Sequence, residues 1–422
     1  MGVAVTTLTN GITVVTMPME HVQSVSVIFY FHVGSRYESD AEAGMCHFIE
    51  HMLFKGTEHF PTARLLSEHI ENVGGDFNAS TGKEITDYNV RLSSEHVERA
   101  IAVLTDLVRY PLFEAAEMEK ERRVILEEIN MYKDSPSEWV EVISDELLFH
   151  GLPLGREVMG DRASVSAITQ EQMRNFFTTH YVPSSLVVSV AGNIAAEETL
   201  ALLEQYLGDW QGPTAPLWIA SPIPKDGPKV SIVERDTEQA NIIISYPAFS
   251  HTDPDHETLL LLDAILGDGM SSRLFQRIRE EQGLSYDIAT SYNSYHDVGS
   301  FDISAGCDPQ QVDTLIASAL EELQHLCNEP VSASELQRVK DYTRGRLLTS
   351  LEGSFSVANW NGGQFTTYGR LFTVAEIIHS IDIVTVADIQ RVAQRIFRRE
   401  DLCLAAIGPL PPASHFEALL QR

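Results

Sequence analysis

Hydrophobic and polar positions in the first half of the chain follow two periods, one typical of strands and one typical of helices. Apolar and polar residues alternate over 3–8 and return over 12–15, with a Thr-Asn-Gly turn between them, which predicts a hairpin. Further extended segments are expected at 25–33, at 77–92 with a break near Gly82, and at 186–191. Helices are expected at 41–55, 62–73, 95–108, 115–132 and 169–180. Because strands and helices do not alternate regularly, the pattern favours an α+β fold over a doubly wound sheet.

The middle of the chain is rich in proline and glycine, from Gln211 to Pro228. Such a stretch between two periodic regions is typical of a linker. A chain of 422 residues is also long for one ordinary hydrophobic core. The sequence therefore predicts an N-terminal domain at 1–212, a linker at 213–228 and a C-terminal domain at 229–422.

The second half of the chain repeats positions of the first half at a constant offset of 209 residues. The repeated pairs are Arg64 and Arg273, Leu65 and Leu274, Gly74 and Gly283, Phe77 and Tyr286, and Thr81 and Thr290. One pair would carry little weight, but a shared offset near half the chain length indicates duplication of one domain.

Composition narrows the classes of partner. The formal net charge is −30, from 30 basic and 60 acidic residues, which argues against nucleic acid as a partner. The acidic charge could attract basic ligands if it lines a cavity, or it could be spread over the surface for solubility. The four cysteines are widely spaced, which predicts reduced thiols and no disulfide framework. No apolar run near 18 residues and no leader are visible, so we expect a cytoplasmic protein that does not bind membranes.

The most specific motif is H-x-x-E-H, formed by His47, Glu50 and His51. Two histidines four residues apart share one face of a helix and can bind one metal ion. A hydrolytic zinc centre uses three protein ligands and keeps one position open. A carboxylate beside that position, here Glu50, can take a proton from water and pass it to a leaving group. The order is that of the inverted zincins. The alternative is a helix that carries two surface histidines.

A third metal ligand is expected on the helix at 115–132. Glu121 and Glu128 are seven residues apart and therefore lie on one stripe of that helix, whereas Glu127 points about 100° away from Glu128. The spacing makes Glu128 the candidate ligand, with Glu121 behind it as a residue that orients the site. Taken alone, this acidic helix could equally be a solvated face.

These motifs together resemble the pitrilysin family, and within it the bacterial relatives of mitochondrial processing peptidase. In that family a ligand glutamate follows H-x-x-E-H after about 76 residues, as Glu128 does here, and another glutamate precedes the ligand by seven, as Glu121 does. The segments 34–38, 51–57 and 74–79 also match the family. The resemblance implies a zinc metalloendopeptidase with one Zn2+ per chain, held by His47, His51 and Glu128. It assigns Glu50 to the activation of water.

The second half contains the family's other signature. The segments 270–276 and 279–286 resemble it, and in the family an arginine and a tyrosine seven residues apart complete the active site from a domain without zinc. Arg279 and Tyr286 match those two positions. Both donate hydrogen bonds, so they could hold a substrate carbonyl and its developing negative charge. From the residues alone, a helix-end arginine and a core tyrosine would be the simpler interpretation.

The resemblance also implies an architecture. Each chain would contain two similar domains, each a mixed, largely antiparallel sheet covered by helices, and would form half of a clamshell that closes around a chamber. A homodimer could be complete, with the Arg/Tyr pair of one copy serving the zinc site of the other. A heterodimer with an inactive homologue stays open as an alternative.

For the substrate, the resemblance implies an extended peptide that adds as a strand to a sheet edge near the metal, at Phe77, Asn78, Ala79 and Ser80. Unfolded peptides, basic or leader-type, are the expected substrates because the protein is acidic. The alternative function is a non-catalytic core subunit of a larger complex, like the subunits of a respiratory complex that resemble this family. Such a subunit would be expected to have lost metal ligands, and this sequence keeps the whole set.

Overall fold

The computed structural model describes residues 2–224 and 227–421. Within them the chain forms two compact units, and each unit contains residues from both halves of the sequence. Unit 1 comprises the chain up to Ile129, together with Glu157–Ile219 and Leu348–Leu371. Unit 2 comprises Asn130–Arg156, the described part of Ala220–Leu347, and the chain from Phe372 onward. The main crossing, at Ile219 and Ala220, lies inside the segment 213–228 that is expected to be a linker. The two units are not simple halves of the chain, because Asn130–Arg156 belongs to unit 2 and Leu348–Leu371 to unit 1, so the domain limits 1–212 and 229–422 stay a prediction.

Unit 1 contains a mixed sheet with the strand order β1-β2-β6-β3-β5-β4. Its strands are β1 (Ala4–Thr7), β2 (Thr13–Pro18), β3 (Ser24–Phe31), β4 (Asp76–Thr81), β5 (Thr86–Ser93) and β6 (Leu186–Gly192). The predicted hairpin is formed by the antiparallel pair β1 and β2, with Gly11 at a φ of 93° in the turn. The pair β2 and β6 is parallel, and the other neighbours are antiparallel. The order leaves β4 at an edge of the described sheet.

The helices of unit 1 are α1 (Met45–Leu53), α2 (Ala63–Glu71), α3 (Val97–Arg109), the start of α4 (Ala115–Asp134), α6 (Arg162–Ala167), α7 (Gln170–His180), α8 (Ala196–Leu207) and α12 (Ser354–Tyr368). One face of the sheet packs against α12, whose Val357 and Ala358 join a core with Ile28 of β3. Gly362 permits this close packing, because an added Cβ would lie 2.4 Å from the Tyr30 ring. The first sheet is therefore covered by a helix from the second half of the sequence.

Unit 2 repeats the arrangement, with the strand order β7-β11-β8-β10-β9. Its strands are β7 (Val230–Glu234), β8 (Ala240–Ala248), β9 (Ser285–Ser294), β10 (Gly299–Cys307) and β11 (Cys403–Gly408). Taken in chain order, these strands correspond to β2, β3, β4, β5 and β6, and the two sheets then have the same neighbours, including one parallel pair each. The α+β fold with two domains related by duplication is confirmed.

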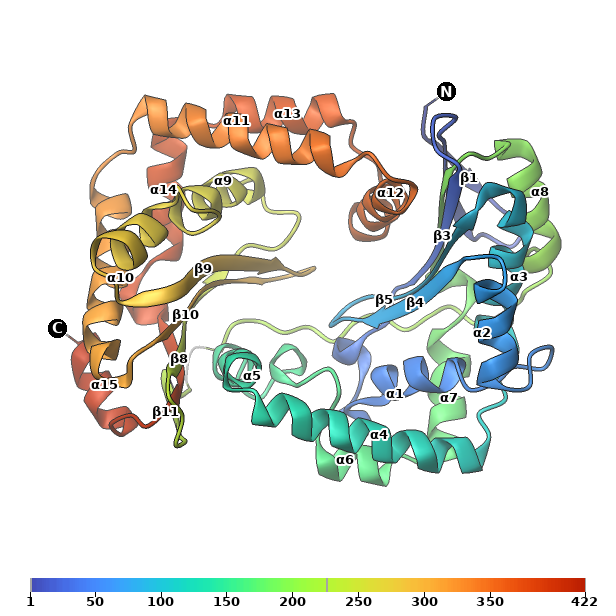
Figure 1. Cartoon of the computed structure of the whole chain (residues 1–422), viewed down its shortest axis with the longest axis horizontal. Coiled ribbons are helices and arrows are strands. Elements are labelled where there is room, and N and C mark those ends of the chain that lie inside the picture. Colours follow the sequence, from blue (N-terminus) through green and yellow to red (C-terminus); the bar gives the residue numbers. More distant parts are fainter. Residues whose placement is uncertain (1, 225–226, 422) are drawn as a thin grey trace. The chain divides into compact units, whose positions relative to one another are not determined.

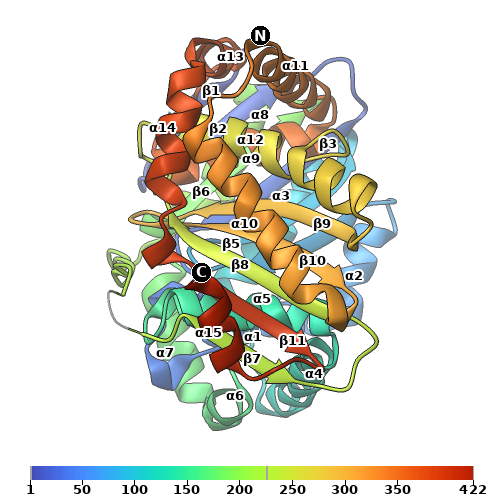
Figure 2. The ribbon, with the colours of Figure 1, turned by 90° about the vertical axis from the view of Figure 1, so that its left-hand side faces the viewer.

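The faces of the second sheet are covered by helices from different halves of the sequence. Its helices are α5 (Pro136–Leu148), α9 (His256–Leu266), α10 (Val312–Asn328), α11 (Ala333–Ser350, up to Leu347), α13 (Val374–Ile383), α14 (Val386–Ile396) and α15 (Ala413–Leu420). Helices α9, α10 and α14 cover one face, and α10 and α14 lie side by side over it (Figures 1 and 2). The period of two along β8 explains the division, because Ile242 and Ile244 enter this core and Ile243 packs with α5. No helix among the described residues is both long and apolar enough to cross a membrane.

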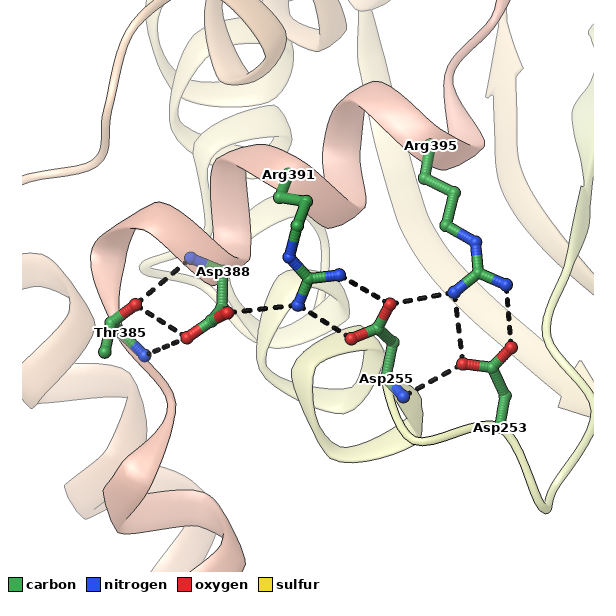
Figure 3. A network of polar contacts seen from close by, with 6 residues as sticks. All are labelled: Asp253, Asp255, Thr385, Asp388, Arg391 and Arg395. Atoms are coloured by element: carbon green, nitrogen blue, oxygen red, sulfur yellow. Dashed lines mark hydrogen bonds and ion pairs between the residues drawn. The ribbon is translucent and has the colours of Figure 1, made fainter.

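An ion network attaches the segment before α9 to α14 (Figure 3). Arg391 donates to both carboxylate oxygens of Asp255, at 2.7 and 2.8 Å, and Arg395 bridges Asp255 and Asp253. Paired hydrogen bonds of this kind fix geometry as well as charge. The network therefore fixes the start of α9 on the helix layer of unit 2.

The contact between α5 and the second sheet contains a buried acid. Ser245 and Ser300 donate to Asp302 on β10, at 2.5 and 2.7 Å, and Ser144 of α5 lies 2.5 Å from the Ser245 hydroxyl. The pKa of Asp302 is raised from 3.8 to about 7, mainly because burial desolvates the carboxylate; the two serine hydrogen bonds oppose the rise, and nearby acidic residues of α5 add to it. The native protein thus holds a proton here that the unfolded chain releases near pH 4.

We expect Asp302→Asn to change the pH dependence of stability. Between about pH 4 and 7 the native wild-type protein binds one more proton than the unfolded chain, so its stability falls as pH rises through this window. Asparagine cannot ionise, so the variant should lose that fall and should have a higher Tm than wild type near pH 8. Thermal unfolding from pH 5 to 8.5 tests this, with Asp341→Asn, an exposed acid of the same unit, as the control. Parallel curves for wild type and Asp302→Asn would contradict it.

Candidate metal centre

Helix α1 carries the H-x-x-E-H motif, and its first turn is fixed by Glu38. The N–H groups of Gly44 and Cys46 donate to the two oxygens of the Glu38 carboxylate, at 2.9 and 2.7 Å. A carboxylate at this end of a helix satisfies otherwise unpaired donors and is favoured by the helix dipole. The apolar residues of α1 are buried in the core of unit 1 and are Met45, Cys46, Phe48, Ile49, Met52 and Leu53. The helix is therefore held so that its histidines face α4.

The structure brings His47, His51 and Glu128 together. One ligand atom from each residue lies within 4.8 Å of the others, which is close enough for a single ion. The Glu128 Oε2 atom is 3.8 Å from His47 Nε2 and 3.5 Å from His51 Nε2. The two imidazole rings are 4.6 Å apart and inclined at 73°. The spacing argument that selected Glu128 and excluded Glu127 therefore agrees with the position of Glu128 on α4.

Glu121 lies behind the histidines, where it contacts His51 and Lys55. The Glu121 Oε2 atom is 3.2 Å from His51 Nδ1, and Oε1 is 2.9 Å from Lys55 Nζ. When Nδ1 carries the proton and donates to Glu121, the Nε2 lone pair of His51 is directed toward Glu128. Such a partner fixes the tautomer and the ring orientation of a metal ligand. Lys55 lies just beyond the end of α1 and was not among the residues predicted from the sequence.

The electrostatics of the three candidate ligands suit a cation. Burial, together with the neighbouring His51, lowers the pKa of His47 to about 4, so its imidazole is neutral at neutral pH. A hydrogen bond with His51 lowers the pKa of Glu128 and keeps it ionised, although burial opposes this. Burial alone would lower the pKa of His51, but Glu128 and Glu121 outweigh it and raise that pKa. The surrounding carboxylates thus favour positive charge at the place where the three ligand atoms meet.

This donor set fits zinc. Two imidazole nitrogens and one carboxylate are ligands that Zn2+ takes in hydrolytic sites. The neutral His47 and the ionised Glu128 are already in the protonation states that metal binding requires.

Glu50 lies beside the candidate ligands and is held by Thr81 of β4, whose hydroxyl donates to the Glu50 carboxylate. Burial raises the pKa of Glu50 above its ordinary value, and the Thr81 hydrogen bond opposes that rise. A carboxylate with a raised pKa is a better proton acceptor than an ordinary surface glutamate. The period of two that places Phe77, Ala79 and Thr81 on one face of β4 is a signal that could have pointed to Thr81.

A cavity of about 270 Å³ adjoins these groups. Its lining consists of Glu50, His51, Phe54, Lys55, Phe77 and Asn78. Two of the four expected substrate-binding residues, Phe77 and Asn78, therefore line a cavity together with Glu50. Ala79 and Ser80 lie further along β4, outside that lining.

The other predicted pair lies in unit 2. The guanidinium of Arg279 lies 4.3 Å from the centre of the Tyr286 ring, and that ring is 78% exposed. The structure therefore places these two residues, which the family resemblance paired, in contact with each other.

Glu121→Gln is expected to weaken zinc binding by about 10- to 100-fold, the range typical of residues that orient a metal ligand. The amide oxygen of glutamine can still accept from His51 Nδ1, but it lacks the charge that favours a bound cation and balances Lys55. A competition titration with a chromophoric chelator measures the affinity. The control is Glu117→Gln, which removes an acid paired with a lysine from the same helix. Equal affinity for wild type and Glu121→Gln would contradict the orienting role.

An H-x-x-E-H helix that faces a glutamate on a second helix, in one half of a duplicated α+β chain, defines a zinc metallopeptidase of the inverted-motif class. Residues 13–162 match the family described as Insulinase (Peptidase family M16), and residues 167–342 match Peptidase M16 inactive domain. The chain belongs to the M16 peptidase family, which confirms the resemblance to the pitrilysin family. It is a zinc protease of this family.

Relatives match over nearly the whole chain. A Streptomyces coelicolor protein named as a zinc protease is 34% identical over 415 residues, which cover 96% of this chain and 89% of the relative. A probable mitochondrial-processing peptidase subunit beta of Arabidopsis thaliana is 31% identical, over 99% of this chain and 80% of the relative.

Solved structures share the fold at lower identity. A protease from Helicobacter pylori has a TM-score of 0.88 at 21% identity, over 96% of this chain and 99% of that chain. A chain of Complex III2 from Candida albicans has a TM-score of 0.84 at 19% identity, over 99% of this chain and 100% of that chain. At these identities the likeness extends to the fold alone.

Proposed function

We propose that the protein is a zinc-dependent endopeptidase that cleaves extended, unfolded peptides. The observation that carries the proposal is the convergence of His47, His51 and Glu128 within 4.8 Å, with Glu50 on the same helix as the two histidines. These three residues would hold one Zn2+ per chain. The complete donor set favours an enzyme over the non-catalytic subunit, although the fold alone is compatible with both.

The roles follow from the chemistry of each group. Zinc, when bound, lowers the pKa of a water molecule to about 7 and polarises a carbonyl. Glu50 accepts the proton of the attacking water and delivers it to the leaving amine, and its raised pKa suits both steps. Thr81 holds the Glu50 carboxylate in place, and Glu121 orients His51.

The substrate would bind as an added strand along β4. Edge-strand addition uses main-chain hydrogen bonds, so it requires an extended peptide and tolerates many sequences. Phe77, Asn78, Ala79 and Ser80 would form the edge that the peptide meets, and the cavity beside Phe77 would receive a side chain next to the cleaved bond. The preferred substrates would be basic or leader-type peptides, because the chain is strongly acidic. A closed chamber would exclude folded proteins.

Arg279 and Tyr286 would hold the substrate carbonyl through hydrogen bonds that strengthen as negative charge develops. We propose that this pair serves the metal centre of a second copy, so that a homodimer is the complete enzyme. A heterodimer with an inactive homologue is the alternative assembly. The cytoplasmic location stays a prediction from the sequence.

The test is cleavage of a basic, unstructured peptide of about 20 residues, followed by mass spectrometry, together with light scattering for the size of the particle. Internal cuts that stop with a zinc chelator and return with added zinc would support the proposal. No cuts by a zinc-loaded dimer would reject the self-sufficient homodimer. No cuts together with no bound zinc would favour the non-catalytic subunit.

A further inference from the structure

The segment that carries Arg279 is a π-helix, η6 (Phe275–Glu281). The wide turn is clear at the end of η6, where the N–H of Gln282 donates to the carbonyl of Arg277, five residues earlier, at 3.2 Å. A π-helical turn is rare, is less favourable than an α-helical one, and recurs at functional sites. The surrounding structure must therefore hold this turn in place.

Two arginines attach one side of the turn to α10. Arg273 and Arg277 each lie 3.0 Å from one oxygen of the Glu322 carboxylate, which is only 7% exposed. Arg273 also pairs with both oxygens of Glu335 on α11, at 2.8 and 2.7 Å. The two-bond contact of Arg273 with Glu335 fixes orientation as well as distance, and the buried Glu322 joins both arginines through one oxygen each. Glu322 is therefore the centre of a clamp on η6.

Two aromatic rings contact the Arg279 guanidinium. Its guanidinium lies 4.6 Å from the centre of the Phe275 ring and 4.3 Å from the centre of the Tyr286 ring. Phe275 is half-buried and is the first residue of η6, four positions before Arg279. An arginine stacked by its flat faces keeps the N–H groups in its plane available to donate. Phe275 and Tyr286 thus restrict the positions that the Arg279 guanidinium can take, and its Nε atom also lies 3.7 Å from a carboxylate oxygen of Glu280.

We propose that Phe275 is a positioning residue for Arg279, and that the Glu322 clamp holds the π-helical turn that presents both. The inference rests on the proposed function, in which Arg279 and Tyr286 bind the substrate carbonyl. A free arginine side chain has many rotamers, and ordering it during the reaction costs free energy. Donors that are already aligned with the developing charge avoid this cost. Loss of the alignment should therefore lower kcat more than it raises KM.

The experiment measures kcat and KM of the intact, zinc-loaded enzyme on an internally quenched peptide. Phe275→Leu keeps an apolar side chain but removes the ring, and we expect kcat to fall by about 10-fold, the size of a partly desolvated cation–π contact. KM should change by less than about twofold. Phe275→Tyr restores the ring and should restore kcat. In an Arg279→Ala background, Phe275→Leu should cause no further fall, because the interaction is already lost.

A second pair of variants tests whether the Glu322 clamp holds the π-helical turn. Glu322→Gln removes the charge that two arginines share, and we expect a fall in kcat in the same direction. The control is Glu321→Gln, whose side chain is 57% exposed and contacts Arg277 alone among the clamp arginines. It should keep kcat near the wild-type value.

Two results would overturn the positioning role. Equal loss of kcat from Phe275→Leu with and without Arg279 would show that the ring acts independently of the arginine. A lower Tm with unchanged kcat per bound zinc would show a purely structural role. If Arg279→Ala itself keeps full kcat, the assigned role of Arg279 is wrong as well, whereas the zinc peptidase activity would stand.

Discussion

Glu50→Gln is expected to leave zinc bound and to lower kcat by on the order of 10³-fold, within the range for loss of a general acid–base group. Glu50 is adjacent to the candidate ligands but is not one of them, so the metal should stay. Glutamine has nearly the same shape, and its amide oxygen can still accept the Thr81 hydroxyl hydrogen bond. What the variant loses is the ability to take a proton from water. Single-turnover and steady-state cleavage of an unstructured peptide measure the fall.

Zinc content and thermal stability of Glu50→Gln are the controls, since both should match the wild type. A further control is Thr81→Ala, which keeps the carboxylate but removes its hydroxyl partner. It should lower kcat by much less than Glu50→Gln does. Wild-type kcat in a clean preparation of Glu50→Gln would reject Glu50 as the group that activates water.

Glu128→Gln is expected to lose zinc, with an affinity more than about 100-fold below wild type, beyond the 10- to 100-fold typical of residues that only orient a ligand. The neutral amide is a poor zinc ligand, and its loss of charge also leaves the two histidines without the carboxylate that favours a cation between them. Activity should fall with the metal. Excess zinc should restore part of it if the peptide site is intact.

Glu127→Gln is the matched control for this loss. It removes the same charge from the same helix, one residue earlier, where the side chain is exposed and points about 100° away. Wild-type zinc binding by Glu127→Gln, with loss in Glu128→Gln, would support the assigned ligand. Loss of zinc in both variants would mean that the total charge of α4 matters more than one ligand, and the assignment would fail.

Much of this site could be predicted from the local sequence, because its residues lie on two helices with regular spacing. A spacing of four residues places His47 and His51 on one face of a helix, and a spacing of seven places Glu121 and Glu128 on one stripe of another. That the two helices face each other could not be derived from spacing, since it depends on packing in the core of unit 1. For that step the prediction relied on the family resemblance. The contact of Thr81 with Glu50 was missed for the same reason, because it joins a strand to a helix.

The duplication could also be predicted from the sequence, but which segments each unit contains could not. A constant offset identified matching positions such as Gly74 and Gly283 in the two halves. Nothing in the pattern of α12 says which sheet it covers, because amphipathic helices are interchangeable at the level of sequence period. The π-helical form of η6 is a further example. The spacing of Arg273 and Arg277 fits an ordinary helix, and their shared partner Glu322 lies on α10, far away in the sequence.

Helix α5, from the first half of the sequence, belongs to unit 2, and α12, from the second half, belongs to unit 1. This arrangement has a consequence for how the chain folds. Unit 1 closes one face of its sheet with contacts such as the hydrogen bond from Tyr30 to Asn359, which spans 329 residues. During synthesis that face stays open until nearly the whole chain has left the ribosome, and closing so long a loop is slow. Each unit needs a helix from the other half of the sequence to complete its core. Neither half of the duplicated chain is therefore expected to fold on its own.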